Sequence, residues 1–342
     1  MESALKTRKN DNAPPARRRG PAVAAAPGDI SVEWEGARKS EWDAFCDAAN
    51  FAAFHQSFAY GDVLAEMGRP PLRARIFIPG KRLIGVAQIE IRKLLGVFTI
   101  GHLMRGPVWT ADGLTAETKS AAIEVLRKTA PIKGLHGFIV SPEGGDDDGL
   151  KHAGYKRIFG GYHTVMLDLT QDEETLRTSL NGKWRNRLNA SEKENLTITP
   201  IAKRIDKYGW LLEKEDERQK AARYRADPTA IVPLFQSAEG KRAIIAFEAK
   251  EGTDRVAGVL FLKHGAHATY QIGWSSAAGK DMNAHNRLLW HAIGDLKKTG
   301  VKMLDLGGVN TDFDPGIARF KIGAGGRVLT LSGSWSKGPR WR

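Results

Sequence analysis

Two kinds of side chain in this sequence are suited to chemistry: clustered cations, and one carboxylate in apolar surroundings. Residues 180–225 carry twelve Lys or Arg against seven acids, and residues 316–342 carry six against none. Clustered cations focus an electrostatic field on anions. Asp305 ends an apolar run that predicts a buried strand, where a carboxylate is costly unless it is paired. The combination favours a cleft that binds a phosphate-rich ligand.

The charge pattern has a second interpretation. The formal net charge is +13, and residues 1–29 add a third basic cluster of six cations against three acids. Solvated surface charge explains such clusters as well as a basic cleft does. The pattern also does not distinguish RNA, a nucleotide-linked substrate and an anionic membrane surface, because all three carry phosphates.

One helix is predicted to carry several of these cations. Thr170 and Glu173 have the spacing of a capping box. An apolar stripe follows at intervals of four residues, made of Leu176, Leu180, Trp184 and Leu188. Lys183, Arg185 and Arg187 border that stripe. They are either part of a solvated basic face or substrate-binding residues that point into a cleft.

Several familiar kinds of site are excluded by the sequence. It has one cysteine, Cys46, so it forms neither an intrachain disulfide nor a cysteine-based zinc site. It has no Gly-x-Ser-x-Gly motif, and its nine histidines show no ligand spacing. Residues 310–316 resemble a calcium loop, but Pro315 and Lys321 stand where that loop needs Gly and Glu. We expect no bound metal and no nucleophilic side chain.

The length and an internal repeat predict two domains. A chain of 342 residues is comfortable for two domains of ordinary size. The segment 82–86 resembles the segment 255–259, and each begins a hairpin that leads to a helix and a buried strand. Two α+β domains of this kind leave a cleft between them, which is a common ligand site. The expected division is a disordered basic tail at 1–29, domains at 30–165 and 166–335, and a basic tail at 336–342.

Periodicity and capping residues predict the individual elements. Helices are expected from Ser40 onward, over 58–67, over 115–129 and over 283–299. Strands are expected over 74–78, 83–91, 95–103, 135–140, 243–249, 255–262, 266–273 and 301–306. No apolar run approaches the length of a membrane span, and the tail lacks the apolar core of a signal peptide. We therefore expect a cytoplasmic protein.

Four segments occur in an order that resembles one known family. They are 163–169, 184–188, 304–308 and 316–321, the last of which is followed by Gly325 and Gly326. Together with the repeat, they resemble the FemA/FemB/FemX family of aminoacyltransferases, which build the interpeptide bridges of peptidoglycan. The resemblance covers residues 31–335. It implies an α+β fold of two tandem GNAT-like (acyl-CoA N-acyltransferase-like) domains with a cleft between them.

The resemblance also implies an activity and its partners. Family members transfer an amino acid from aminoacyl-tRNA to the lysine-type amine of a peptidoglycan precursor. The partners would then be tRNA and a UDP-linked or lipid-linked precursor, with peripheral contact to an anionic membrane surface. Aminoacyl-tRNA is a co-substrate, so no bound cofactor is expected.

Site residues follow from this reaction. An amine attacks an ester carbonyl, and a fixed cation beside the developing oxyanion is usually the largest catalytic contribution. Lys321 resembles the lysine of the family's Phe-Lys pair, and its expected role is to stabilise that oxyanion or hold the tRNA 3′ end. Asp305 is the second catalytic candidate, because it could orient Lys321 or Arg319 or accept the amine proton. The expected substrate-binding residues are Lys183, Arg185, Arg187, Tyr270, Trp274, Asn310, Arg319 and Phe320.

Two other functions remain open. CoA-using GNAT enzymes carry an Arg/Gln-x-x-Gly-x-Gly/Ala loop before a helix, and neither 275–281 nor 105–109 has this pattern. An N-acyltransferase that uses acyl-CoA or an acyl carrier protein on another amine is nevertheless the first alternative. A non-catalytic duplicate that binds RNA or anionic lipid is the second. The transferred amino acid, the acceptor and the oligomeric state stay open.

Overall fold

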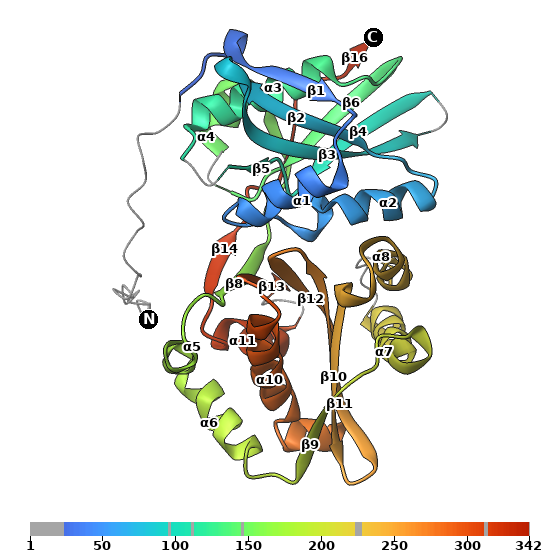
Figure 1. The fold of residues 1–342 in the computed structure, drawn as a ribbon, viewed down its shortest axis with the longest axis vertical. Coiled ribbons are helices and arrows are strands. Elements are labelled where there is room, and N and C mark those ends of the chain that lie inside the picture. Colours follow the sequence, from blue (N-terminus) through green and yellow to red (C-terminus); the bar gives the residue numbers. More distant parts are fainter. Residues whose placement is uncertain are drawn as a thin grey trace, which may run out of the picture.

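The computed structural model describes residues 24–94, 97–110, 113–144, 147–222, 228–310 and 314–341. The chain forms two domains, each built around a β-sheet, and the domains are stacked along the long axis of the molecule (Figure 1). Helices α1 (Lys39–Ala48) and α2 (Phe58–Glu66) lie between the two sheets. The predicted duplication of an α+β unit is confirmed.

The first domain contains a nine-stranded sheet. Its strands are β1 (Ser31–Trp34), β2 (Leu72–Ile78), β3 (Arg82–Leu94), β4 (Phe98–Met104), β5 (Val108–Trp109), β6 (Leu135–Ser141), β7 (Lys156–Phe159), β15 (Ser334–Ser336) and β16 (Arg340–Trp341). The strand order is β1-β2-β3-β4-β6-β15-β7, with β5 paired to β3 and β16 paired to β6. Helices α3 (Ala116–Thr129) and α4 (Asp147–His152) pack their apolar residues against this sheet.

The second domain contains a seven-stranded sheet. Its strands are β8 (His163–Asp168), β9 (Leu196–Pro200), β10 (Ile244–Glu251), β11 (Asp254–His264), β12 (His267–Ser275), β13 (Met303–Val309) and β14 (Arg327–Thr330). The order is β14-β8-β13-β12-β11-β10-β9. Its helices are α5 (Glu173–Ser179), α6 (Gly182–Ser191), α7 (Ile205–Ala222), α8 (Ile231–Glu239), α9 (Ala277–Asp281), α10 (Ala284–Lys298) and α11 (Pro315–Gly323).

The two faces of the second sheet bury different apolar clusters. On one face, α6, α10 and α11 pack against the strands around Trp184 and Phe261. On the other face, α7 and α8 pack against the strands around Phe235 and Leu260, and Phe54 and its neighbours from the first domain join them. The hydrophobic effect therefore holds the domains together through a shared core. This shared core fixes the position of the first domain relative to the second sheet.

The C-terminal segment returns to the first domain. β15 pairs with β6 and β7, and β16 pairs with β6 at Arg340 and Trp341. Trp335 is fully buried in the core of that sheet. The sequence-based division placed residues up to 335 in the second domain and 336–342 in a tail. The structure differs because β-sheet pairing, which local sequence does not reveal, takes these residues back to the first sheet.

Two predicted helix starts also differ from the structure. The stripe from Leu176 to Leu188 belongs to two helices, because Leu180 leaves helical geometry and Asn181 caps α6. The cap of α5 is Asp172, which accepts the N–H of Thr175, rather than Thr170. Near the N-terminus, Ser40 lies inside the first turn of α1 instead of capping it. Both errors follow from reading one apolar stripe or one capping residue without the backbone geometry.

Residues 1–23 of the predicted disordered tail lie outside the described residues, while Pro27–Asp29 form a short 3-10 helix. No helix in the described part of the chain combines the length and the apolar character that crossing a bilayer requires.

Candidate active site

The candidate site begins where two parallel strands of the second sheet separate. β12 and β13 pair only over three positions, from His267 opposite Met303 to Thr269 opposite Asp305. Tyr270 is the first residue of β12 beyond that pairing. We call this divergence the β12–β13 fork. It brings side chains from both strands and from the helices that flank them to one place.

A β-bulge on β12 decides which side chains face the fork. The register between β11 and β12 shifts at Gln271, which has no partner on β11, so the side chains after it change faces. Tyr270 packs edge-on against Phe261 in the cluster below α10. Trp274 packs in the cluster on the opposite face, with its ring 5.6 Å from that of Trp210. Both residues were expected to bind substrate, but the structure places Tyr270 and Trp274 on opposite faces of the sheet.

A second bulge shapes β13. The register between β13 and β8 shifts between Asp305 and Gly308. Gly307, inside this bulge, has a φ of 75°, a conformation that glycine adopts without the strain other residues meet. Its N–H donates to Oδ1 of Asp305 at 2.7 Å. The bulge turns the next carbonyl group, that of Gly308, toward Lys321.

Lys321 reaches the fork from α11, a helix that the sequence analysis did not predict. Asp314 caps this helix by accepting the N–H of Ile317 at 3.0 Å. The Nζ of Lys321 donates to the carbonyl oxygen of Gly308 at 2.9 Å. It also lies 5.6 Å from the centre of the Tyr270 ring, within the range of a cation–π contact. The amine is thus held between a turn of β13 and an aromatic face of β12.

The surroundings of this amine change its protonation. Burial lowers the pKa of Lys321 to about 8, although the carboxylate of Asp305 opposes the shift. Arg218 of α7 lowers the pKa further and Glu215 raises it. The two α7 side chains form an ion pair at 2.8 Å. A lysine with a pKa near 8 is mostly protonated at neutral pH and can still exchange its proton in catalysis.

Tyr270 is fixed by a histidine on α10. Its hydroxyl oxygen lies 2.7 Å from Nε2 of His285. Burial lowers the pKa of His285 to about 4, so the ring is neutral near pH 7 and accepts the hydrogen bond from Tyr270. Phe320, a predicted substrate-binding residue, packs 5.2 Å from the same ring and 5.9 Å from Trp184. The structure therefore places Phe320 as a packing partner of the residues around the fork.

Asp305 is the most deeply buried carboxylate of the site. Its side chain is 0% exposed. Nη1 of Arg105 donates to Oδ2 at 2.5 Å, and the hydroxyl of Thr164 and the N–H of Gly307 donate to Oδ1. Burial alone would raise the pKa of Asp305, but Arg105 and these hydrogen bonds hold it below its ordinary value. The described hydrogen bonds of Asp305 are to Arg105, Thr164 and Gly307, and none of them is to Lys321 or Arg319, the two cations that it was predicted to orient.

The three cations predicted on α6 lie on its outer sides. Lys183 and Arg187 are exposed, and Arg185 is half-buried. Arg185 lines an open surface depression together with Glu173, Glu174, Arg177 and Thr178 around α5. The N-terminal end of α6 nevertheless touches α11, because the N–H of Asn181 donates to the carbonyl of Gly323. The cations therefore border the helix that carries Lys321 without contacting Lys321 itself in the described structure.

The other predicted residues on this side are also peripheral. Arg319 is exposed, and its Nε donates to the carbonyl of Pro315 in its own helix at 3.0 Å. Asn310 is exposed at the end of β13. Asp312, which belongs to the calcium-like spacing, lies outside the described residues. In the parts of the chain that are described, no group of three or more His, Cys, Asp or Glu is arranged to hold a metal ion.

Several groups at the fork come from elements that the sequence alone did not connect with it. Arg105 and Thr164 both reach Asp305, and His285 holds Tyr270. Glu215 and Arg218 of α7 act on the pKa of Lys321. The only sequence signal for these pairings was the prediction that a buried Asp305 needs a partner, which did not identify Arg105. The partner is 200 residues away along the chain.

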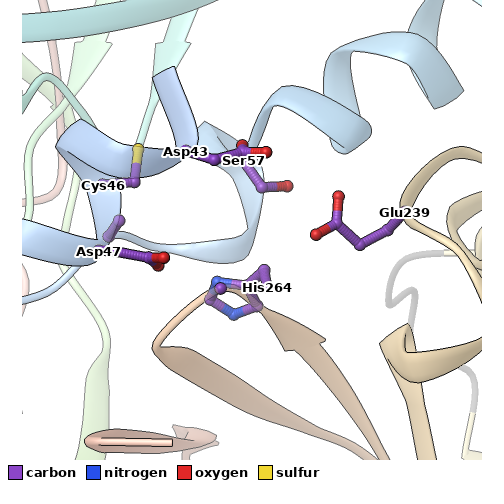
Figure 2. Close-up of a pocket in the computed structure, with 8 residues that line it drawn as sticks. Asp43, Cys46, Asp47, Ser57, Glu239 and His264 are labelled. Carbon is purple, nitrogen blue, oxygen red and sulfur yellow. The ribbon is translucent and has the colours of Figure 1, made fainter. Parts of the chain in front are cut away.

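The contact between the domains is closed beside this site. A recess lined by Asp43, Asp47 and Ser57 of the first domain and by Glu239 and His264 of the second has a volume of only about 10 Å³ (Figure 2). That is room for about one water molecule. The sequence predicted a ligand cleft between the domains, but this part of the interface is packed. The candidate site instead lies at the β12–β13 fork.

Comparisons with known proteins agree with this architecture. Residues 211–340 match the FemAB family, a range that contains Tyr270, Asp305 and Lys321. This match covers less than half of the chain, so it is a similarity of the C-terminal part to the FemAB family. The crystal structure of FemX aligns with a TM-score of 0.71 at 14% identity, covering 89% of this chain and 96% of that chain. No curated protein matches the sequence.

Two further solved structures are similar to this chain. A conserved protein of unknown function from Bacteroides thetaiotaomicron VPI-5482 has a TM-score of 0.56 at 13% identity, covering 90% of this chain and 99% of that chain. A tandem GNAT protein from the clavulanic acid biosynthesis pathway has a TM-score of 0.49 at 13% identity, covering 91% and 100%. The expected fold of two tandem α+β domains is confirmed by the alignment with FemX. The family match together with this fold supports an acyltransferase.

Proposed function

We propose that the protein transfers an aminoacyl group from aminoacyl-tRNA to an amine of a peptidoglycan precursor. The observation that carries this proposal is the amine of Lys321 at the β12–β13 fork, held 2.9 Å from the Gly308 carbonyl and with its pKa lowered to about 8. It lies within the segment that matches the FemAB family. A fixed cation of this kind suits a reaction whose transition state develops negative charge on oxygen.

The proposed reaction needs no covalent intermediate on the protein. The acceptor amine attacks the ester carbonyl of the aminoacyl group and forms a C–N bond, and the carbonyl oxygen becomes an oxyanion. When the oxyanion collapses, the C–O bond to the ribose breaks, and the proton lost by the attacking nitrogen balances the proton that the leaving ribose oxygen gains. Lys321, as an ammonium, donates a hydrogen bond to the oxyanion and thereby lowers the barrier. Its lowered pKa also makes its proton easier to give to the leaving oxygen than that of an ordinary lysine. Cys46 is buried, and burial raises the pKa of its thiol, so this group is poorly suited to act as a thiolate nucleophile.

The neighbouring residues hold Lys321 in this role. The carbonyl of Gly308 accepts one N–H of the ammonium, so the direction of the remaining N–H groups is restricted. The Tyr270 ring supports the cation from β12, and His285 fixes the Tyr270 hydroxyl. A cation that is already oriented loses little energy to reorganisation when the oxyanion forms.

The exposed cations supply a binding surface for the donor. Lys183 and Arg187 project from α6, and Arg319 projects from α11, the helix that also carries Lys321. The phosphate backbone of tRNA would bind such a surface largely through electrostatics, with a strong dependence on salt. The precursor's diphosphate is the second anion that these side chains would accept.

The experiment is label transfer followed by mass spectrometry. The purified chain is mixed with bulk aminoacyl-tRNA, and separately with acetyl-CoA, in the presence of UDP-muramoyl-pentapeptide or its lipid-linked form. A gain of one amino-acid mass on the peptide, dependent on tRNA, is the expected result and identifies the residue added. Lys321→Ala is expected to lower this transfer by at least about 100-fold while the protein still folds.

The other outcomes separate the alternatives. A mass gain with acetyl-CoA alone would replace the proposal with an N-acyltransferase. Salt-sensitive RNA binding without any product would favour a non-catalytic duplicate. A fully active Lys321→Ala protein would remove Lys321 from the mechanism even if transfer occurs.

A further inference from the structure

A chain of contacts connects the first domain to Lys321. Arg105, which follows β4 of the first domain, donates to Asp305 on β13 at 2.5 Å. Asp305 accepts the N–H of Gly307 at 2.7 Å, and the carbonyl of the next residue, Gly308, accepts Nζ of Lys321 at 2.9 Å. Each contact holds the group that makes the next one. We propose that Arg105 is a positioning residue for Lys321, so that the first domain completes the site in the second.

Arg105 is built for a fixed position. Its side chain is 7% exposed, and its backbone has a φ of 49°, which is unusual for a residue other than glycine. Backbone strain of this kind persists only where surrounding structure holds it in place. Gln56, which is 0% exposed, provides part of that structure, because its Nε2 donates to the carbonyl of Met104 at 2.7 Å.

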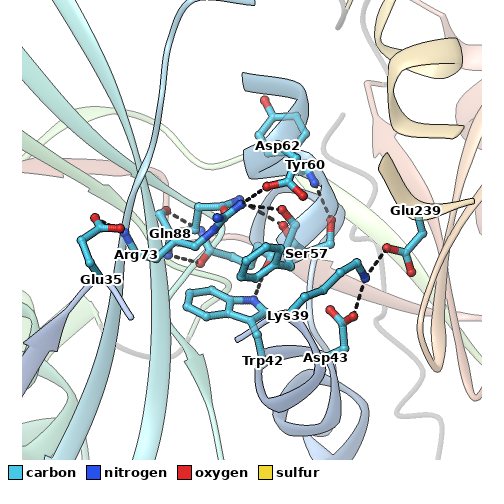
Figure 3. A network of polar contacts seen from close by, with 12 residues as sticks. Glu35, Lys39, Trp42, Asp43, Ser57, Tyr60, Asp62, Arg73, Gln88 and Glu239 are labelled. Carbon is cyan, nitrogen blue, oxygen red and sulfur yellow. Dashed lines mark hydrogen bonds and ion pairs between the residues drawn. The ribbon is translucent and has the colours of Figure 1, made fainter. Parts of the chain in front are cut away.

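The support behind Gln56 extends through the first domain. Gln56 donates to the carbonyl of Gln88 at 3.0 Å and accepts its N–H at 2.8 Å. The Gln88 side chain in turn accepts a hydrogen bond from Arg73, which also pairs with Asp62 (Figure 3). A fully hydrogen-bonded buried network of this kind rigidifies its surroundings. The turn that carries Arg105 is thus anchored to the strands of its own domain.

The guanidinium of Arg105 is shared between two carboxylates. Its Nε and Nη2 donate to the two oxygens of Glu143 at 2.7 and 2.8 Å, while Nη1 donates to Asp305. Glu143 belongs to the same domain as Arg105. It therefore fixes the plane of the guanidinium independently of the contact with Asp305. A planar group with donors on fixed edges transmits direction as well as charge. A lysine at this position would supply charge without that direction.

A purely structural role is the competing interpretation. Removing one partner of a buried ion pair destabilises a protein whether or not a site is nearby. The two interpretations differ in what happens to the amine of Lys321. The positioning role rests on the proposed function of Lys321, but its direct readout is the titration of that amine, which can be measured without any substrate.

The experiment is competitive labelling of lysines in the full chain. Acetic anhydride modifies only the neutral amine, so the extent of labelling of Lys321 between about pH 6 and 11, read by mass spectrometry, reports its pKa. The native protein is compared with Arg105→Met, Arg105→Lys and Lys39→Met. Folding of each variant is checked by thermal unfolding.

Lys39 supplies the matched control. It also crosses the domain boundary, because its Nζ bonds to Glu239 at 2.8 Å and to Asp43 of its own helix (Figure 3). In the described structure neither carboxylate contacts the Gly307–Gly308 turn. Lys39→Met therefore breaks an interdomain ion pair without entering the path to Lys321.

We expect the apparent pKa of Lys321 to change by at least about one pH unit in Arg105→Met, and by less in Arg105→Lys. The displacement is upward while Asp305 stays ionised, because an unpaired carboxylate attracts the ammonium more strongly. It is downward once Asp305 takes up a proton. Lys39→Met is expected to leave the titration unchanged.

Three results would overturn the inference. One is a native titration of Lys321 in a folded Arg105→Met protein. Another, where Arg105→Met does not fold, is a native titration in Arg105→Lys. The third is an equal displacement in Lys39→Met, which would mean that any break between the domains has the same effect. If the native protein showed no transfer activity, the proposed function would be wrong. The titration of Lys321 would still test whether Arg105 positions its amine.

Discussion

The two domains share one plan but differ at their parallel strand pairs. In the first domain, β4 and β6 stay paired from Thr99 opposite His136 to Met104 opposite Ser141. In the second, β12 and β13 separate after Thr269. The first pair is closed and packed, while the second diverges and receives Lys321 from α11. The difference teaches that one copy of a duplicated unit can carry the reacting groups while the other supports them.

The closed pair leaves no room at the corresponding place. A Cβ atom added to Gly101 on β4 would lie 2.9 Å from Cδ1 of Ile132 and 3.3 Å from Cγ2 of Ile89. The first domain instead contributes Arg105, immediately after β4, to the carboxylate of Asp305 just before the fork. The first domain therefore contributes to the site through a residue that follows β4, and not through residues within the β4–β6 pair.

Matched glycine substitutions in the two domains give the largest contrast. Gly307→Ala places a side chain on a residue with a φ of 75° and 3.5 Å from Nζ of Lys321. We expect transfer to fall by about tenfold to 100-fold, because small misplacements of a catalytic group are costly. Strain at this φ should also lower the free energy of unfolding by about 1–2 kcal/mol.

Gly101→Ala is the comparison for that variant. The added methyl group overpacks the first domain, so we expect a stability loss of about 1–3 kcal/mol with transfer close to native at a temperature where both proteins are folded. Initial transfer rates and urea unfolding of both variants test the contrast. Equal losses of transfer would mean that the fork has no special place in the mechanism.

The alkaline pH dependence of transfer tests the state of Lys321. The groups that act on its pKa are Asp305, Glu215, Arg218 and Asp314, and burial has the largest effect. With a pKa of about 8, the ammonium is present below that pH and is lost as the pH rises through it. Transfer should therefore decline above pH 8, by about tenfold one pH unit higher.

Lys321→Arg separates this decline from other alkaline effects. Arginine stays charged throughout the range, so whatever activity this variant retains should not fall between about pH 8 and 9. Profiles of kcat/KM against pH for the two proteins make the comparison. A decline shared by both would assign it to the donor or the acceptor amine instead of Lys321.

Acid stability should draw on both domains. Burial lowers the pKa of His102 in the first domain and of His285 in the second to about 4. Between about pH 6.5 and 4 the unfolded chain binds protons at these positions that the folded chain does not. Stability is therefore present above the unfolded pKa and falls as the pH drops, by up to about 1.4 kcal/mol per pH unit for each histidine.

Glutamine substitutions measure each domain's share of that loss. His102→Gln and His285→Gln should each flatten the decrease of the free energy of unfolding between about pH 6.5 and 4, followed by urea unfolding. His264 and His267 at the domain interface also have lowered pKa values, because both are buried, so part of the slope should persist in both variants. An unchanged slope in either variant would contradict the neutral state assigned to that ring.

Most of the fold was predictable because it depends on local patterns. Apolar periodicity gave α2, α3 and α10, and alternating or buried runs gave the paired strands of both sheets. The duplication was visible because the segments 82–86 and 255–259 repeat the same residue types. The return of β15 was not predictable, because a three-residue strand carries almost no local signal.

The site was only partly predictable for a related reason. Lys321 and Asp305 were found through a resemblance, and the burial of Asp305 followed from its apolar neighbours. The orientation of Tyr270 depends on an unpaired Gln271, and sequence alternation assumes that no such bulge exists. Arg105 lies 200 residues from its partner, so only the assembled fold could join the two.

The smallest expected effect tests that bulge directly. Trp274, like Tyr270, was expected to bind substrate, but it packs against Trp210 on the face shared with α7. Trp274→Phe keeps an aromatic ring in that cluster, so transfer should stay within about twofold of native. A loss beyond about tenfold in initial rate, with native thermal unfolding, would mean that Trp274 reaches the substrate. Side chains on both faces of β12 would then contact the substrate. The bulge at Gln271 would no longer determine which residues of β12 belong to the site.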